Sequence, residues 1–356
     1  MQFRDTIILG YYTGNEIKIK QENNKMLNQS INILKQMQYP TGLFAASRMT
    51  VKTGYNLAWI RDNVYAAIGL EAAQKYSDVK RVLRALLDIL LKHEYKIDWA
   101  IKEKPEHHYQ YIHARYDPIT MEEIWENWGN KQNDAVGALL FKIGDLEEKG
   151  VKIIRNKNDL RILQKLAHYL GSIEYWHDKD NGMWEEKEEV HASSIGACAA
   201  GLKKIKKIVD VDNELIRNGE EALNKLLPRE SETKESDMAL LSLIYPYDIV
   251  MPEQRNIILK NVEENLVKEK GVIRYIGDKY HYRNGEAQWT KGLPWLAIIY
   301  KRMNKPDKYA YYMRKTVEAM NEKGELPELY YANSDEHNEN TPLAWSQALF
   351  VAGLKE

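Results

Sequence analysis

Hydrophobic residues recur at intervals of three and four along almost the whole chain, the spacing that places them on one face of an α-helix. The first twenty residues differ, because the stretch TIILGYYTGNEIKIK alternates as a β-strand does. We therefore expect residues 1–23 to form an N-terminal extension with a possible short β-hairpin. The helical spacing predicts twelve helices, at residues 24–38, 61–76, 77–101, 132–148, 158–175, 192–208, 212–226, 235–245, 252–268, 288–303, 306–322 and 342–354.

The twelve predicted helices follow one another without a Pro/Ser-rich linker, which indicates a single domain over residues 24–356. Such a series suggests an all-α fold, an (α/α)6 barrel of six antiparallel pairs in which inner helices alternate with outer ones. The longest irregular connections join helices 1 and 2, 3 and 4, 5 and 6, 9 and 10, and 11 and 12. In an alternating barrel these odd-to-even connections emerge at one end, and long loops in compact domains are usually functional.

Composition and charge narrow the classes of partner. The formal net charge of -1 gives no electrostatic reason to expect nucleic acid or an anionic membrane. Cys198 is the single cysteine, so no disulfide is possible within the chain, and a reducing cytoplasm is the expected location. No apolar run approaches the length of a membrane span. His113 has no second histidine at metal-ligand spacing, and we expect neither a metal nor a cofactor.

Two short segments, GMWEE and LPELYY, each set a carboxylate among aromatic or apolar neighbours. Glu185 follows Met183 and Trp184, and desolvation by such neighbours raises the pKa of a carboxyl toward the value that a general acid needs near neutrality. Pro327 stiffens the approach to Glu328, the candidate base. A carboxylic acid that faces a carboxylate, with room for water between them, is the arrangement of inverting glycosidases. A solvated run of charge is the alternative interpretation of this acidic stretch, and it best fits Glu188 and Glu189, which follow the first segment.

The segment WIRDNVY places Trp59, Arg61 and Asp62 at or just before the start of the second predicted helix. An arginine fork and a carboxylate beside the free N–H groups of a helix N-terminus suit the vicinal hydroxyls of a hexose. We predict that these three residues bind substrate. An aspartate that caps the helix, with an arginine as its partner, is an equally supported interpretation.

Further candidate substrate contacts lie on the other long connections. Trp128, in WGNKQND, is placed to stack on a sugar ring, while Asn133 and Asp134 are expected to cap the fourth helix. Trp184 and Glu186 flank the candidate acid, and Arg274 lies in the fourth long connection. The 23 Tyr and 9 Trp against 4 Phe favour rings that carry a hydrogen-bonding group, although helix packing explains most of them.

The motifs WIRDNVY, HARY, WGNKQND, MWEE, LPELYY and PLAWSQALF occur in this order over about residues 38–354. In this the chain resembles glycoside hydrolase family 15, which contains glucoamylases and the glucoamylase-like domains of the phosphorylase kinase α and β subunits. The resemblance implies an (α/α)6 barrel whose pocket cleaves α-glucosidic bonds from the non-reducing end with inversion. It places the pair that holds the terminal glucose at Arg61 and Asp62, and the pocket tryptophan at Trp128. It implies that Glu185 is the general acid and Glu328 the general base.

We therefore expect a glucoamylase-like hydrolase that releases β-glucose from soluble α-glucans or oligosaccharides. The stretch before the first predicted helix is too short for the β-sandwich domain of prokaryotic glucoamylases, so granular starch is not the expected substrate. HARY, HASSIGA and PELYY are more similar to the phosphorylase kinase subunits than to secreted glucoamylases. A non-catalytic glucan-binding or regulatory module, and a trehalase-like hydrolase, therefore remain alternatives.

Overall fold

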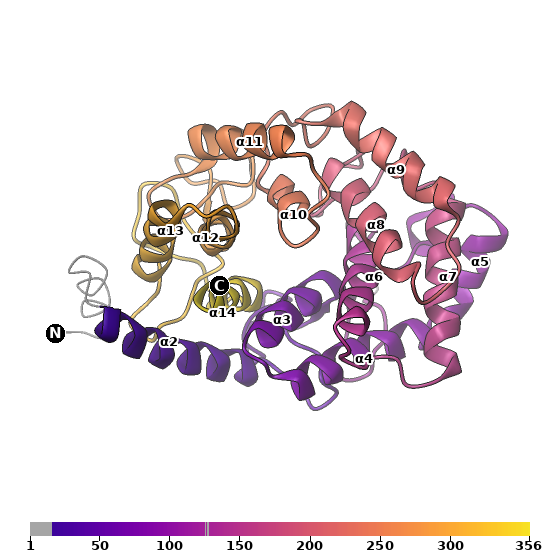
Figure 1. Ribbon diagram of the computed structural model, residues 1–356, viewed down its shortest axis with the longest axis horizontal. Helices are drawn as coiled ribbons and strands as arrows, with labels where there is room; N and C mark the ends of the chain where they lie inside the picture. The colour runs from indigo at the N-terminus through magenta and orange to yellow at the C-terminus, as the bar shows by residue number, and fades with distance from the viewer. Residues whose placement is uncertain (1–15, 125, 127) are drawn as a thin grey trace.

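The computed structural model describes residues 16–124, 126 and 128–356, and its described α-helices form two concentric rings (Figure 1). The inner ring consists of α3 (Ile60–Ala72), α6 (Asn133–Glu148), α8 (Ala192–Ile205), α10 (Leu241–Ile244), α12 (Gly292–Arg302) and α14 (Ala344–Lys355). The outer ring consists of α2 (Glu16–Gln36), α4 (Tyr76–Lys92), α5 (Glu94–Lys102), α7 (Lys157–Ile173), α9 (Asn213–Leu226), α11 (Pro252–Asn261) and α13 (Pro306–Glu318). Shorter helical turns are η1 (His108–Gln110), η2 (Met238–Leu240) and η3 (Val262–Leu266).

The sequence of each helix determines the ring to which it belongs. In α3 every residue from Ile60 to Leu70 is buried, and α14 is buried from Ala344 to Gly353, because inner helices are covered on all sides. In α9, an outer helix, the fully buried residues are Ile216, Gly219 and Leu223, which form one stripe spaced by three and four. The rings therefore alternate along the chain as the predicted (α/α)6 barrel requires, and this fold is confirmed.

The C-terminal helix closes the ring. Figure 1 shows α14 between α3 and α12, with the C-terminus near the middle of the molecule. The N–H of Ala344 donates to the carbonyl of Ala46 at 2.8 Å. Gln347 donates to Ser30 Oγ at 2.7 Å and accepts from the N–H of Leu326 at 3.1 Å. The two ends of the described chain are thus joined by buried hydrogen bonds.

The structure differs from the prediction in the number of helices and at the N-terminus. The stretch 77–101 forms two helices, α4 and α5, which meet at His93, so the described residues contain thirteen α-helices and not twelve. The predicted N-terminal hairpin is wrong for residues 16–20, which lie in α2, while residues 1–15 lie outside the described residues. Glu, Lys and Gln dominate this first part of α2, and their helix propensity outweighs the short alternation of EIKIK.

Four two-residue strands in the described residues were not predicted, because so short a strand leaves no alternating pattern. They are β1 (Ala58–Trp59), β2 (Arg115–Tyr116), β3 (Gln288–Trp289) and β4 (Leu329–Tyr330). β1 pairs antiparallel with β2, and β3 with β4. Each pair ties together two of the long connections at the same end of the barrel. No described helix is long and apolar enough to cross a bilayer.

Candidate active site

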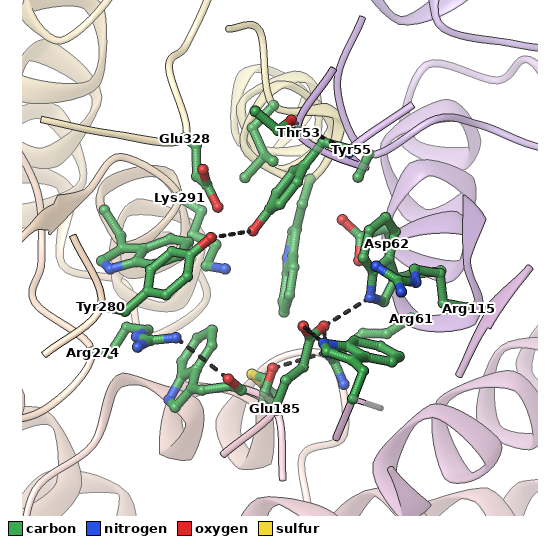
Figure 2. Close-up of a pocket in the computed structure, with 18 residues that line it drawn as sticks. Thr53, Tyr55, Arg61, Asp62, Arg115, Glu185, Arg274, Tyr280, Lys291 and Glu328 are labelled. Atoms are coloured by element: carbon green, nitrogen blue, oxygen red, sulfur yellow. Dashed lines mark hydrogen bonds and ion pairs between the residues drawn. The ribbon is translucent and has the colours of Figure 1, made fainter. Parts of the chain in front are cut away.

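A cavity of about 210 Å³ opens where the long connections meet (Figure 2). All five odd-to-even connections singled out from the sequence contribute to it. Its lining residues are Ala46, Thr53, Tyr55, Trp59, Arg61, Asp62, Arg115, Trp128, Met183, Trp184, Glu185, Arg274, Tyr280, Trp289, Lys291, Glu328, Leu343 and Trp345.

Glu185 is held in place by its own loop and by two indole groups. Its φ of 63° lies in the left-handed region, an uncommon conformation for a residue with a side chain. Asn181 secures this turn, because its carbonyl accepts from the N–H of Glu186 at 2.9 Å and its amide donates to the carbonyl of Glu186 at 2.6 Å. Trp59 Nε1 donates to Glu185 Oε1 at 2.7 Å, and Trp128 Nε1 donates to Oε2 at 3.1 Å.

The environment of Glu185 favours its protonated form. Burial raises the pKa of this carboxyl to about 7, and the nearby charge of Asp62 raises it as well. Arg61 and the Trp59 hydrogen bond act in the opposite direction, but they only partly offset burial. One quarter of the Glu185 side chain is nevertheless exposed to the cavity, so a bound molecule can reach the carboxyl. Glu185 therefore has the properties of a general acid near neutral pH.

Glu328 faces the cavity from the opposite side (Figure 2). The side-chain amides of Asn338 and Asn340 both donate to Oε2, the latter at 2.7 Å. Oε1 is buried and has no hydrogen-bond partner among the described residues. The two asparagines thus fix the direction of the carboxylate and leave one oxygen free to accept from a water or a ligand hydroxyl.

Two tyrosines lie at the rim beside Glu328. The hydroxyl oxygens of Tyr55 and Tyr280 are 3.3 Å apart, and Figure 2 shows the two rings pointing toward one another. Burial and the charge of Glu328 raise the pKa of both phenols, that of Tyr280 to about 12. Both hydroxyls therefore stay protonated near neutral pH and can donate hydrogen bonds.

Arg61 and Asp62 have different tasks although they are neighbours in the sequence. Arg61 Nη1 donates to both carboxylate oxygens of Asp134 at 2.9 Å, and Nη2 donates to the carbonyl of Met183 at 2.8 Å. Asp62 is buried, and burial raises the pKa of its carboxyl. Neither Asp62 nor Asp134 occupies the N-cap position of its helix, which is Trp59 in α3 and Gln132 in α6. Asp134, expected to be a cap, is instead the ion-pair partner of Arg61.

Glu186 is the predicted site residue that does not line the cavity. Its carboxylate accepts from Arg274 at 3.0 Å, from the Tyr275 hydroxyl at 2.6 Å and from Lys234 at 2.5 Å. Asp278 holds the same arginine at 2.6 and 2.7 Å. Glu186 thus positions Arg274 from behind, and Arg274 reaches the cavity.

The structure brings together the other predicted site residues, namely Trp59, Arg61, Asp62, Trp128, Trp184, Glu185, Arg274 and Glu328. Sequence reasoning did not identify Lys291 or the two asparagines that hold Glu328. The asparagines lie in the polar run NSDEHNEN, in which no spacing or neighbour distinguishes them from the other polar residues. Lys291 lies in the first turn of the helix predicted at residues 288–303, and a lone lysine gives no signal of burial.

Arg115 stacks over the two tryptophans that hold Glu185. Its guanidinium lies 4.3 Å from the Trp128 ring centroid and 5.2 Å from that of Trp59. Arg115 belongs to the HARY motif, and β2 places it opposite Trp59 of β1. Among the described residues, no group of His, Cys, Asp and Glu is arranged to hold a metal ion.

The chain has recognisable relatives. The family model described as "Glycosyl hydrolases family 15" matches residues 20–214. The probable phosphorylase b kinase regulatory subunit alpha of Caenorhabditis elegans is 24% identical over 371 residues, which cover 83% of this chain and 30% of that protein. The chain thus spans about 30% of the length of this curated relative.

Solved structures share the fold. A glycosidase variant in complex with glucose matches with a TM-score of 0.78 at 18% identity, covering 93% of this chain and 95% of that one. The glucoamylase from Saccharomycopsis fibuligera matches with a TM-score of 0.65 at 12% identity, covering 94% of each chain. The two-ring barrel is therefore the glucoamylase-like (α/α)6 fold.

Proposed function

The chain belongs to glycosyl hydrolases family 15, and we propose that it is an inverting, exo-acting hydrolase that releases β-glucose from the non-reducing end of soluble α-glucans or oligosaccharides. The observation that carries this proposal is the pair Glu185 and Glu328, which face one cavity from opposite sides (Figure 2). The two carboxyl groups differ in environment, as an acid and a base must.

Glu185 would protonate the departing glycosidic oxygen. Its pKa of about 7 keeps it protonated through the mildly acidic range, and its exposed fraction lets it reach the scissile bond. The two indole N–H groups, from Trp59 and Trp128, would stabilise the carboxylate that remains after the proton has left.

Glu328 would activate the attacking water. Its free Oε1 is the acceptor that this water requires, while Asn338 and Asn340 hold Oε2. Because the water would approach from the side opposite the acid, the product would have the inverted, β configuration. Room for a water molecule between the two carboxyl groups is the feature that separates inverting from retaining glycosidases.

The cavity favours the end of a chain over its middle. A volume of about 210 Å³ is below the roughly 300–1,000 Å³ typical of sites for drug-sized ligands, and it suits one sugar ring. Trp59, Trp128, Trp184, Trp289 and Trp345 provide aromatic faces for that ring. Asp62 supplies a carboxylate for its hydroxyls, and the glycosidase variant matched above was solved with glucose.

The second candidate function is a non-catalytic glucan-binding or regulatory module. The observation that favours it is the 24% identity to a phosphorylase b kinase regulatory subunit. Such a module would need the hydroxyl-binding residues but not the pair Glu185 and Glu328. A hydrolase of trehalase-like specificity would keep the pair and differ in the linkage that it accepts.

Turnover separates these functions. We would incubate the protein with maltotriose, maltose, isomaltose and trehalose, and follow the anomeric proton signals at early times. Early β-glucose is expected with at least one of these sugars. Glu185→Gln and Glu328→Gln should each lower the rate about 10²- to 10⁴-fold, the usual contribution of a general acid or base.

Matched controls keep this test specific. Glu188 lies in the same loop as Glu185, and the exposed Glu336 lies in the same loop as Glu328, but neither glutamate lines the cavity. Glu188→Gln and Glu336→Gln are therefore the control variants. Both should retain wild-type rates. Tight glucan binding without turnover would support the module, and early α-glucose would contradict the inverting mechanism.

A further inference from the structure

Lys291 is a buried amine at the inner end of the cavity. It directly precedes α12 and is only 3% exposed, yet it lines the cavity, and Figure 2 shows its nitrogen near Glu328. Three indole rings surround its Nζ. The ring centroids of Trp345, Trp289 and Trp184 lie 4.1, 4.4 and 4.5 Å from it.

The ammonium has no hydrogen-bond acceptor in the described part of the chain, whereas the arginines that line the cavity are paired. Asp134 binds Arg61 at 2.9 Å, Glu126 binds Arg115 at 2.5 Å, and Asp278 binds Arg274 at 2.6 Å. Lys291 forms no such ion pair with any residue that the structure describes. The structure therefore contains a polar group that is more than nine-tenths buried and still has donors to offer.

Burial of such a group is costly. An ammonium out of water loses its hydration, and the faces of three indoles compensate only in part. Burial lowers the pKa of Lys291 to about 7, with Asp62 and Glu328 opposing this shift and Arg61 and Arg274 adding to it. A methionine would fill the same volume at no electrostatic cost, so packing alone does not explain a lysine here.

We propose that Lys291 is a substrate-positioning residue whose amine donates hydrogen bonds to hydroxyl oxygens of the sugar ring seated in the cavity. This inference rests on the proposed function only in taking a sugar as the ligand. A neutral polyol fits better than an anion, because Asp62, Glu185 and Glu328 face the same space and would repel a negative group.

Binding of glucose tests this role without requiring turnover. D-glucose and its 2-, 3-, 4- and 6-deoxy analogues would be titrated while tryptophan fluorescence is followed, since Lys291 is surrounded by indoles. In the wild type, the analogue that lacks the contacted hydroxyl should bind about 10- to 100-fold more weakly than glucose, the loss typical of a hydrogen bond to a charged donor. In Lys291→Met, the affinity for glucose should fall by a similar factor. That one deoxy analogue should then bind as tightly as glucose, because the donor that its missing hydroxyl contacted is gone.

The other deoxy analogues should still bind more weakly than glucose to Lys291→Met, because other residues contact those hydroxyls. Lys291→Gln keeps a hydrogen-bond donor without the charge, so its affinity for glucose should lie between those of the wild type and Lys291→Met. Lys279→Met, the same change at an exposed lysine outside the cavity lining, should bind like the wild type.

A purely structural role predicts a different result. In that case Lys291→Met would alter the melting temperature, but the affinities of the deoxy analogues relative to glucose would be the same as in the wild type. That result would overturn the proposal. Failure of the wild type to bind glucose would overturn it as well. If glucose binds with the expected pattern but no sugar is hydrolysed, the hydrolase function fails and the role of Lys291 stands.

Discussion

The Glu185 carboxyl is poised between two opposing influences. Burial favours its neutral form, while the Trp59 indole at 2.7 Å and the Arg61 charge favour the ionised form. The balance is a pKa of about 7, so modest changes around the carboxyl move its titration across neutral pH. An acid must be protonated before it can act, so kcat/KM should fall as the pH rises through this pKa.

Trp59→Phe should shift that fall to higher pH. Loss of the indole donor removes an interaction that stabilises the ionised carboxylate, so the pKa of Glu185 should rise further, by about one unit. The alkaline limb of kcat/KM against pH should move by the same amount, with a lower maximum because the carboxylate formed in the reaction loses a donor. The measurement is this pH profile with whichever sugar the wild type hydrolyses.

The control for this shift is Trp99→Phe on the surface of α5, where the indole is exposed. The alkaline limb of kcat/KM against pH for Trp99→Phe should coincide with that of the wild type. An unchanged or lower apparent pKa in Trp59→Phe would mean that Glu185 is not the group that limits activity at high pH.

At the scale of elements, close approach of the inner helices α6 and α8 supports the site. A Cβ at Gly137 would lie 2.4 Å from backbone atoms of Ala197 and Cys198, a distance that real structures do not allow. Cys198 is buried in this contact and donates to the carbonyl of Asn133 at 3.2 Å. Asp134 follows directly, so the helix that carries the partner of Arg61 is positioned by a glycine.

Gly137→Ala should therefore destabilise the fold and disturb the site. Backbone atoms cannot move aside as a side chain can, so the two helices must separate, at a cost of about 1–3 kcal/mol or more. Equilibrium unfolding in urea measures this loss. Glucose binding should weaken in the same variant, because Asp134 and Arg61 shift with the helix.

Gly171→Ala in the outer helix α7 is the matched control. Its Cβ would meet only the side chain of Leu215, the nearest atom at 3.2 Å, and alanine has the higher helix propensity. The free energy of unfolding should change by less than about 1 kcal/mol. Equal losses in both variants would contradict the view that α6 and α8 form the tighter contact.

For the whole molecule, ring closure makes the first and last helices depend on each other. The buried hydrogen bonds of α14 reach Ala46, Ser30 and Leu326, so three distant parts of the sequence depend on one helix. The domain assignment of residues 24–356 as a single unit remains a prediction, and unfolding can test it.

Heat should unfold the barrel in one transition, seen at the same temperature by far-UV circular dichroism and by tryptophan fluorescence. Deletion of residues 344–356 should abolish this transition, because the inner ring would lose a fully buried helix. Deletion of residues 355–356 is the control, since it removes an exposed Arg302 ion pair worth less than about 1 kcal/mol. Two separate transitions in the wild type would contradict a single domain.

Much of the element level was readable in the sequence. Each of the twelve predicted helices overlaps a helix of the structure, because a helix that must bury one face shows that face in its sequence. The helix predicted at 235–245 is shorter than expected, since only α10 (Leu241–Ile244) and the turn η2 before it are helical there. The break at His93 escaped, since the apolar spacing continues across it and a change of axis leaves no periodic mark. The short strands escaped because two residues are too few to alternate.

The sequence by itself determined the alternation of helices, the long loops at one end, and the residue types suited to sugar chemistry. Only the tertiary structure decided which of these groups meet. It paired Arg61 with Asp134 and not with Asp62, placed Glu186 behind Arg274, and left Lys291 without an acceptor among the described residues. Spacing along a chain reports which face of a helix is buried, but contacts between side chains from separate loops depend on how the ring closes.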